Sequence, residues 1–135
     1  MTEGPEHERQ FISSFIIPER QNRYLELREK PKRRKDITDS LAHFKHLDMR
    51  YVVQIAPSQQ HAPNILKILK EKGAADRYWA ISEDDELDGE ELELSTTLKS
   101  AVGHDMGTVL SCIPGQHAYF EDEDEGWILE RRMKR

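Results

Sequence analysis

The sequence predicts an α/β or α+β fold: a small mixed sheet of about four strands with crossover helices, preceded by an N-terminal helical region. Apolar residues come in coherent blocks, the blocks before residue 49 have helical spacing, and strand-like and helix-like blocks alternate after it. A chain of 135 residues fits one domain. We therefore expect a single compact domain, with a disordered terminus at 1–6, a helical region at 7–48 and a sheet region at 49–135.

The first apolar block favours a helix over residues 7–17. Phe11 and Phe15, like Ile12 and Ile16, repeat at the four-residue spacing that places side chains on one helix face. A strand remains the alternative, because Phe and Ile at this density also suit an extended segment.

Two further helices are expected in the N-terminal region. Pro18 suits the first position of a helix that continues to about Lys30, because a missing N–H costs nothing there. Asp36 is a suitable N-cap for a third helix that ends near Phe44.

The sheet region alternates between strand and helix patterns. Turn residues separate its blocks, and Pro114-Gly115 predicts a turn between two antiparallel strands. Strands joined by helices indicate parallel pairing with right-handed crossovers elsewhere in the sheet. The expected strands are 50–55, 77–82, 108–113 and 117–120; the expected helices are 63–72 and 95–102, the second capped by Ser95; residues 127–129 fit either.

The composition indicates which cellular compartment and which kinds of partner to expect. The formal net charge is −6, but residues 1–50 hold eleven basic and nine acidic side chains, whereas residues 51–135 hold nine and seventeen. Cys112 is the only cysteine, so the chain cannot form an internal disulfide. The apolar blocks are too short to span a bilayer. We expect a soluble, acidic, cytoplasmic protein that does not contact membranes and that binds another protein or associates with itself.

The densest charge cluster is the acidic stretch at residues 82–95, which holds eight carboxylates. Asp84, Glu86 and Asp88 match the first ligand positions of a calcium-binding EF-hand loop. The twelfth position, however, is Ser95, which cannot supply the two oxygens of the usual glutamate. A turn at Asp88-Gly89 with solvated carboxylates is the simpler interpretation. The sequence predicts no cofactor, with binding of a divalent cation as the alternative.

A basic segment at residues 28–35 is the candidate binding site for an anionic partner. Nucleic acid is one such partner, since Lys and Arg release counterions from phosphates, and an acidic surface of a neighbouring copy is another. No aromatic residue lies within the segment for base stacking, which favours a solvated helix end. The candidate residues are Arg28, Lys32, Arg33, Arg34 and Lys35.

The candidate catalytic residues are His61, Asp84 and Asp85. They follow the first two predicted strands, and ligands of parallel sheets bind outside the carboxyl ends of strands. The segment at 103–112, with His104 next to Asp105, also resembles a site, but its loop enters the amino end of its strand.

These observations favour a non-enzymatic protein-interaction or regulatory module that uses the acidic stretches at 83–93 and 121–125. One alternative is a small metal-dependent hydrolase or nuclease that uses the carboxylates at a strand end. A second alternative is a nucleic-acid-binding protein that uses residues 28–35.

Overall fold

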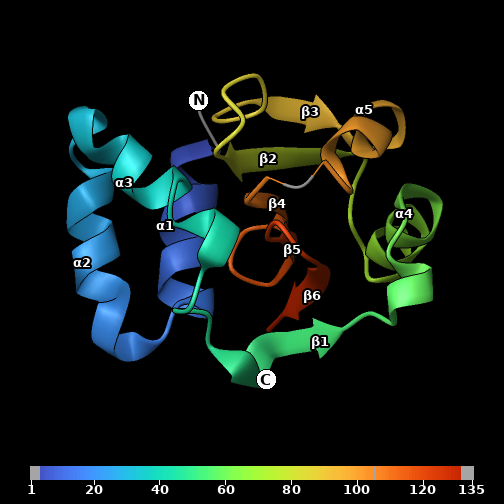
Figure 1. The fold of residues 1–135 in the computed structure, drawn as a ribbon, viewed down its shortest axis with the longest axis horizontal. Helices are drawn as coiled ribbons and strands as arrows, with labels where there is room; N and C mark the ends of the chain where they lie inside the picture. Colours follow the sequence, from blue (N-terminus) through green and yellow to red (C-terminus); the bar gives the residue numbers. More distant parts are fainter. Residues whose placement is uncertain (1–3, 105, 132–135) are drawn as a thin grey trace.

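The computed structural model describes residues 4–104 and 106–131. It contains a six-stranded sheet with the order β1-β6-β5-β4-β2-β3, in which every neighbouring pair is antiparallel (Figure 1). The α+β form of the predicted fold is confirmed, and the number of strands and the parallel pairing are wrong. The strands are β1 (Val52–Gln54), β2 (Arg77–Ser82), β3 (Glu91–Glu93), β4 (Thr108–Ile113), β5 (His117–Glu121) and β6 (Gly126–Glu130).

The strand that the sequence did not predict explains the antiparallel pairing. β3 turns back beside β2, and the helix after it returns the chain so that β4 pairs with β2 in the opposite direction. Residues Glu91-Leu92-Glu93 show almost no strand pattern, because Glu has low strand propensity and the strand is only three residues long. The last apolar block, which fitted a strand or a helix, is strand β6.

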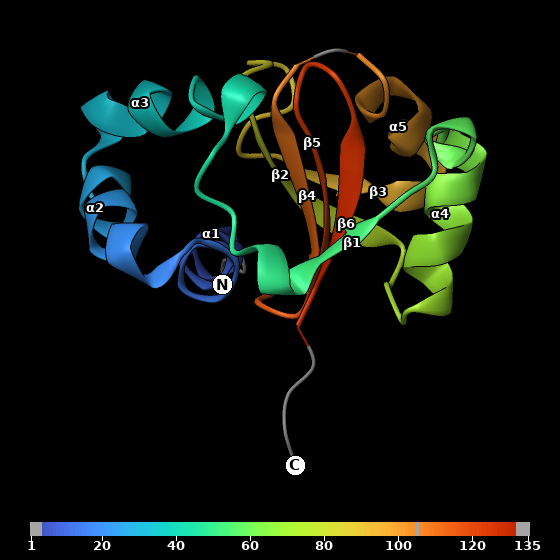
Figure 2. The same ribbon diagram turned by 60° about the horizontal axis from the view of Figure 1, so that its bottom comes forward.

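Three helices of the N-terminal region cover one face of the sheet: α1 (Gly4–Phe15), α2 (Pro18–Arg28) and α3 (Arg34–Thr38) (Figure 2). The helical interpretation of the first block is confirmed, and its aromatic residues Phe11 and Phe15 are both buried. Pro18 opens α2 as predicted.

The third helix differs from its prediction. It begins at Arg34 and ends at Thr38, with 3₁₀ turns at η1 (Pro31–Arg33) before it and η2 (Leu41–His43) after it. Asp36 lies inside the helix and not at its N-cap, and its carboxylate pairs with the Arg33 guanidinium. Two further 3₁₀ turns, η3 (Met49–Tyr51) and η4 (Pro57–Gln59), flank β1.

Helices α4 (Ala62–Glu71) and α5 (Leu94–Ala101) cover the other face. Ser95 lies inside α5 and is not its cap; instead the Asp76 carboxylate accepts hydrogen bonds from the Ser95 backbone N–H at 2.9 Å and from its hydroxyl at 2.8 Å. Asp76 therefore supplies from outside the helix the acceptor that the first turn needs. No helix among the described residues is long and apolar enough to cross a membrane.

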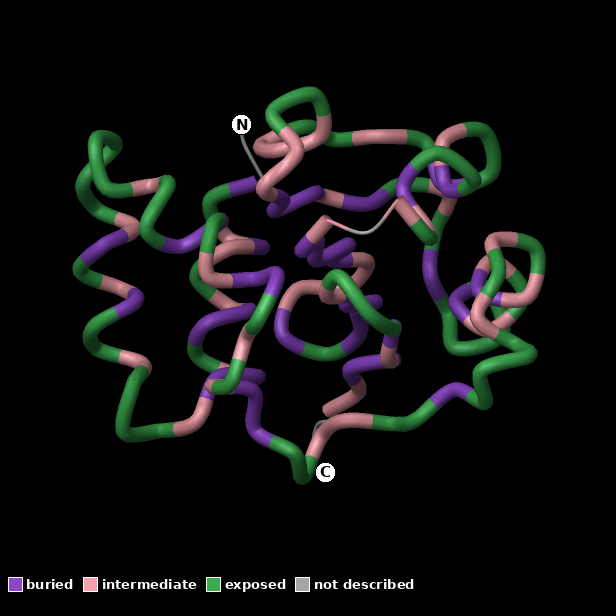
Figure 3. Tube along the Cα trace, viewed as in Figure 1, coloured by how far each residue is buried: buried purple, intermediate pink, exposed green. Residues whose placement is uncertain are grey.

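The sheet separates two apolar cores. Successive residues of β4 alternate between them: Val109 packs with the N-terminal helices, and Leu110 packs with α4 and α5. Figure 3 shows the resulting buried residues along the central strands. The central sheet is therefore closed on both faces, and polar groups gather at the two ends of the strands.

Candidate functional site

One end of the sheet collects the acidic loops, and we call it the acidic end. Strands β2 and β5 finish there, while β4 and β6 begin there, as the top of Figure 2 shows. Because β2 and β4 are antiparallel, the loop that enters β4 lies beside the carboxyl end of β2. His104 Nε2 is consequently 3.8 Å from Asp84 Oδ2. The prediction that this loop lies away from the carboxyl ends of the other strands assumed parallel strands, and it is wrong.

Glu121 lies at the centre of the acidic end and is only 3% exposed. Its carboxylate accepts hydrogen bonds from the Gly103 backbone N–H at 2.9 and 3.1 Å and from the Tyr119 hydroxyl at 2.9 Å. His104 Nδ1 is 3.0 Å from Glu121 Oε2. Burial, and then the charge of Glu121, raises the pKa of Tyr119, so the phenol stays protonated and donates to the carboxylate. The buried charge is thus surrounded by donors.

A carboxylate, an imidazole and a hydroxyl follow one another here in the order of a catalytic triad. Thr108 Oγ1 lies 3.5 Å from His104 Nε2 and 2.7 Å from Ser82 Oγ. Both hydroxyl residues have 0% exposure, however, and Ser82 Oγ also accepts from the Asp84 backbone N–H at 2.9 Å. A nucleophile must reach its substrate, so this arrangement is suited to holding the loops of the acidic end together.

The acidic hairpin loop, residues Asp122–Glu125 between β5 and β6, is held internally by a side chain. Asp122 Oδ1 accepts hydrogen bonds from the backbone N–H groups of Asp124 at 2.7 Å and Glu125 at 2.8 Å. Such side-chain to backbone bonds fix the turn conformation.

Distant segments also hold the acidic hairpin loop. The Glu123 N–H donates to the Ala42 carbonyl at 3.3 Å, and its carboxylate lies 3.3 Å from His43 Nε2. On the other side, the Gly126 N–H donates to Gln60 Oε1 at 2.9 Å. The loop is therefore anchored on both flanks, with its remaining carboxylates directed into solvent.

The candidate catalytic residues do not form one group. Three strands separate β1 from β2, which corresponds to about 19 Å at ordinary strand spacing. His61 follows β1 and caps α4, where its Nδ1 accepts from the Asn64 N–H at 3.4 Å. Asp84 lies beside His104, and the exposed Asp85 pairs with Lys35.

The basic segment and the acidic stretch neutralise each other through a charge clamp, which consists of Arg34, Glu8 and Asp88. The Arg34 guanidinium makes two hydrogen bonds of 2.8 Å to Glu8 and bonds of 2.6 and 2.8 Å to Asp88. These bonds, with Asp88 contributing most, raise the pKa of Arg34 further above its usual range. Trp79 Nε1 also donates to Glu8 at 2.9 Å, which connects the clamp to β2.

Most of the other predicted basic residues are also paired. Lys35 pairs with Asp85, Arg33 with Asp36, and Arg28 with Glu29 at 3.0 Å and with Glu8 at 3.9 Å. Lys32 is exposed on η1. The basic segment therefore acts mainly within this chain.

The carboxylates proposed for a divalent cation have hydrogen-bond partners in the protein. Asp84 Oδ1 accepts from the Glu86 N–H at 3.0 Å, and Asp88 Oδ1 accepts from the Ser82 N–H at 3.0 Å. Gly89 has a φ of +74°, which confirms the predicted turn. Across the described ranges, no group of three or more His, Cys, Asp or Glu side chains is arranged to hold a metal ion.

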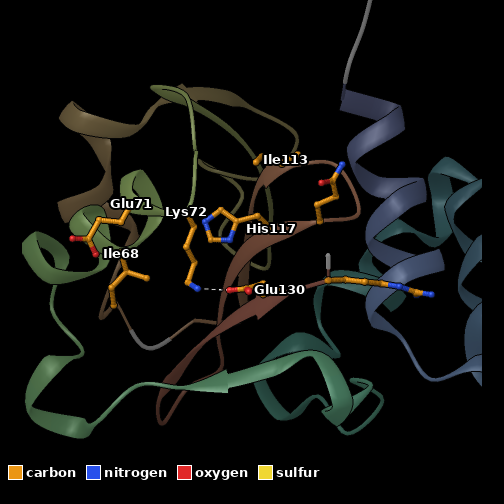
Figure 4. A pocket seen from close by; sticks show the side chains of 8 residues that line it. Ile68, Glu71, Lys72, Ile113, His117 and Glu130 are labelled. Carbon is orange, nitrogen blue, oxygen red and sulfur yellow. Dashed lines mark ion pairs between the residues drawn. The ribbon is translucent and has the colours of Figure 1, made fainter. Parts of the chain in front are cut away.

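The opposite end of the sheet contains a pocket of about 470 Å³, beside the carboxyl terminus of α4 (Figure 4). An ion pair between Lys72 and Glu130 crosses it, and the His117 ring lies beside that pair. His117 is 3% exposed, and neither ring nitrogen makes a hydrogen bond to another described residue, although the carbonyls of Leu69 and Leu129 are close enough to affect its pKa.

The chemistry of this pocket is limited by the burial of its histidine. Burial lowers the pKa of His117, and the charge of Glu130 only partly opposes this effect. The ring is thus neutral at pH 7, and its nitrogens have almost no exposed surface with which to contact a ligand. The sequence gives no indication of a role for His117, because one histidine at the start of a strand carries no distinctive pattern.

Glu121, expected in the acidic stretch at 121–125, is the last residue of strand β5. A signal for this was present: Tyr119 and Glu121 are two residues apart and therefore share one face of the strand. That spacing predicts an inward-facing carboxylate beside a phenol.

Comparison with known proteins gave no family. No family model, no curated protein and no solved structure matches this chain.

Proposed function

We propose that this chain is a non-enzymatic interaction module that binds a basic partner protein at its acidic end. The observation that carries the proposal is the acidic hairpin loop. Its backbone is held on both flanks, yet Asp124 and Glu125 are exposed and form no ion pair with any other described residue.

Preorganisation makes such a loop suited to binding. A carboxylate that is already held in position loses less conformational entropy on association than one in a flexible loop. Clustered negative charge also raises the association rate of a positively charged partner, most strongly at low ionic strength.

The contrast with the other acidic stretch supports the choice of surface. In that stretch Asp85 and Asp88 already pair with Lys35 and Arg34 of the same chain. In the hairpin loop, Glu123 alone has a side-chain partner of opposite sign within the part of the chain that the structure describes. That partner is His43, which is charged only when protonated. Asp124 and Glu125 therefore keep their negative charge available for a partner.

The enzymatic alternative stays a prediction with less support. A metal-dependent hydrolase or nuclease would need Asp84 and Asp85 to exchange their present partners for a cation. A cytoplasmic location belongs to the main proposal, because a single cysteine suits a reducing compartment.

Self-association is a second form of the interaction proposal, and edge strand β1 is where it would occur. Val53 is 44% exposed and the nearby Met49 is 64% exposed. An unpaired strand edge with exposed apolar residues is able to pair with another copy. Light scattering across a concentration series tests this, with Val53→Lys expected to abolish any dimer.

The proposed function is tested by charge reversal. Basic proteins captured from a lysate are purified, and the affinity of each is measured by calorimetry at low and at physiological salt. Asp124→Lys combined with Glu125→Lys should lower the affinity for the genuine partner at least ten-fold, with the largest loss of affinity at low salt.

The matched control is Glu19→Lys combined with Glu26→Lys, which reverses the same charge on exposed residues of α2. This control should change the affinity by less than about two-fold. Equal losses in both double variants would show that only the net charge matters, and the acidic hairpin loop would then not be the binding surface.

A further inference from the structure

The net acidic chain contains a hollow lined by arginines, beside α2. It has a volume of about 320 Å³ and lies between α2, the segment that leads into α3, and residue 46. Its lining residues are Arg20, Arg23, Tyr24, Leu27, Arg33, Asp36 and His46.

The cations of this hollow differ from those of the basic segment. Arg28, Arg34 and Lys35 are used in ion pairs with carboxylates of this chain. Arg20 and Arg23, by contrast, are exposed and pair with no carboxylate in the described residues. Three guanidinium groups therefore face one carboxylate, that of Asp36, which leaves the hollow with an excess of about two positive charges when His46 is neutral.

The position of Arg20 adds to this observation. It lies in the first turn of α2, where the helix dipole disfavours a positive charge. The first turn also contains Glu19, which the dipole favours. A cation in this position is more stable with an anion beside it, and none of the described carboxylates provides an ion pair.

A buried tyrosine and a histidine line one side of the hollow. Tyr24 is buried, and its hydroxyl lies 2.9 Å from His46 Nδ1. The same tyrosine packs edge-on against Phe44, with ring centroids 5.6 Å apart. Asp36 pairs with Arg33 Nε and so fixes the direction of that guanidinium.

We propose that this hollow binds the phosphate or diphosphate group of a small phosphorylated ligand. Planar guanidinium groups match phosphate oxygens with paired hydrogen bonds, and a phosphate carries the one to two negative charges that the hollow lacks. A single group fits better than a nucleic-acid backbone, because the neighbouring cations Arg28, Arg34 and Lys35 are already paired with carboxylates.

The test is calorimetric titration of the whole chain with pyrophosphate at low salt. Arg20→Met combined with Arg23→Met should weaken binding at least ten-fold. Arg20→Lys combined with Arg23→Lys keeps the charge but loses the planar guanidinium groups. Its affinity for pyrophosphate should lie between that of the Met double variant and that of the unchanged protein.

The control is Arg9→Met combined with Arg77→Met, which removes the same charge from exposed positions outside the hollow. Binding should change by less than about two-fold in this control. An equal loss in the control, or an affinity weaker than about 10 mM for the unchanged chain, would overturn the proposal.

A second titration distinguishes a small phosphorylated ligand from a nucleic acid. A short single-stranded RNA with the same number of phosphates per site should bind no more tightly than pyrophosphate, and its affinity should have a shallow salt dependence. Much tighter RNA binding with a steep salt dependence would show that the ligand is nucleic acid and would overturn the small-ligand proposal.

Discussion

Individual polar residues of this protein serve mainly to hold loops at the ends of the sheet. Glu121 is the clearest example, because its buried carboxylate accepts hydrogen bonds from the Gly103 N–H, the Tyr119 hydroxyl and the His104 ring. A carboxylate that is fully surrounded by donors stabilises the surrounding loops, and removing its charge leaves those donors poorly matched.

Replacement of Glu121 by Gln should therefore destabilise the fold by about 2 kcal/mol, because hydrogen bonds to a charged group contribute more than those to an amide. Urea denaturation followed by circular dichroism measures the change. Glu123→Gln, two residues away and exposed, should change the free energy of unfolding by less than about 0.5 kcal/mol. Equal effects of the two substitutions would mean that Glu121 does not have the role assigned to it.

His117 predicts a pH dependence of stability. Its pKa is lowered in the folded state by burial, while the unfolded chain titrates near 6.5. Below that pH the unfolded state binds more protons, so stability falls as the pH decreases. The charged neighbours Glu130 and Lys72 act in opposite directions and do not reverse the sign.

The loss should reach as much as about 1.4 kcal/mol per pH unit below 6.5. Thermal unfolding at pH 7.5 and pH 5.5 measures it, and His117→Phe removes the titrating group while keeping a buried ring. The variant should lose less stability on acidification than the unchanged protein. The same loss in both would assign the pH dependence to other groups.

At the level of elements, the charge clamp connects parts of the chain that are far apart in sequence. Arg34 of α3 joins Glu8 of α1 to Asp88 of the turn after β2. The N-terminal helices are thus attached to the sheet by polar contacts as well as by the apolar core.

Substitution of Arg34 by Met should cost about 2 kcal/mol of stability in this partly solvated site. Asp88 loses its ion pair, and Glu8 keeps only the longer 3.9 Å contact with Arg28 among the described cations. Arg34→Lys should lose about half as much, because an ammonium group cannot form both pairs of bonds. Arg33→Met, which removes an exposed pair, should change stability by less than about 0.5 kcal/mol in the same urea titration. A similar loss for Arg33 and Arg34 would contradict the clamp.

The sequence predicted those elements whose apolar pattern is strong. Strands 77–82 and 108–113 were correctly placed, and α4 differs from its prediction by one residue at each end. β3 and the short α3 were missed or misplaced, because they are held by contacts with distant residues and not by their own periodicity.

The candidate site was less predictable for a related reason. Asp84 and His104 are twenty residues apart, and only the antiparallel pairing of β2 and β4 brings them together. Pairing direction depends on β3, which carries almost no strand signal in the sequence.

The whole molecule is a two-faced sheet with different chemistry at its ends. Apolar residues fill both faces, so polar function is restricted to the ends of the strands and to the outer helix surfaces. The acidic hairpin loop lies at one end, and the arginine hollow lies on α2. Because the two sites use different residues, we expect a basic protein and a phosphorylated ligand to bind at the same time without competing.

The most direct measurement for the proposed interaction is zero-length carbodiimide coupling, which joins carboxylates to lysines that touch them. Applied to the purified complex and read by mass spectrometry, it should link Asp124 and Glu125 to lysines of the partner. Few links should form from Glu19 and Glu26 of α2. Links concentrated on α2, with none from the acidic hairpin loop, would contradict the account.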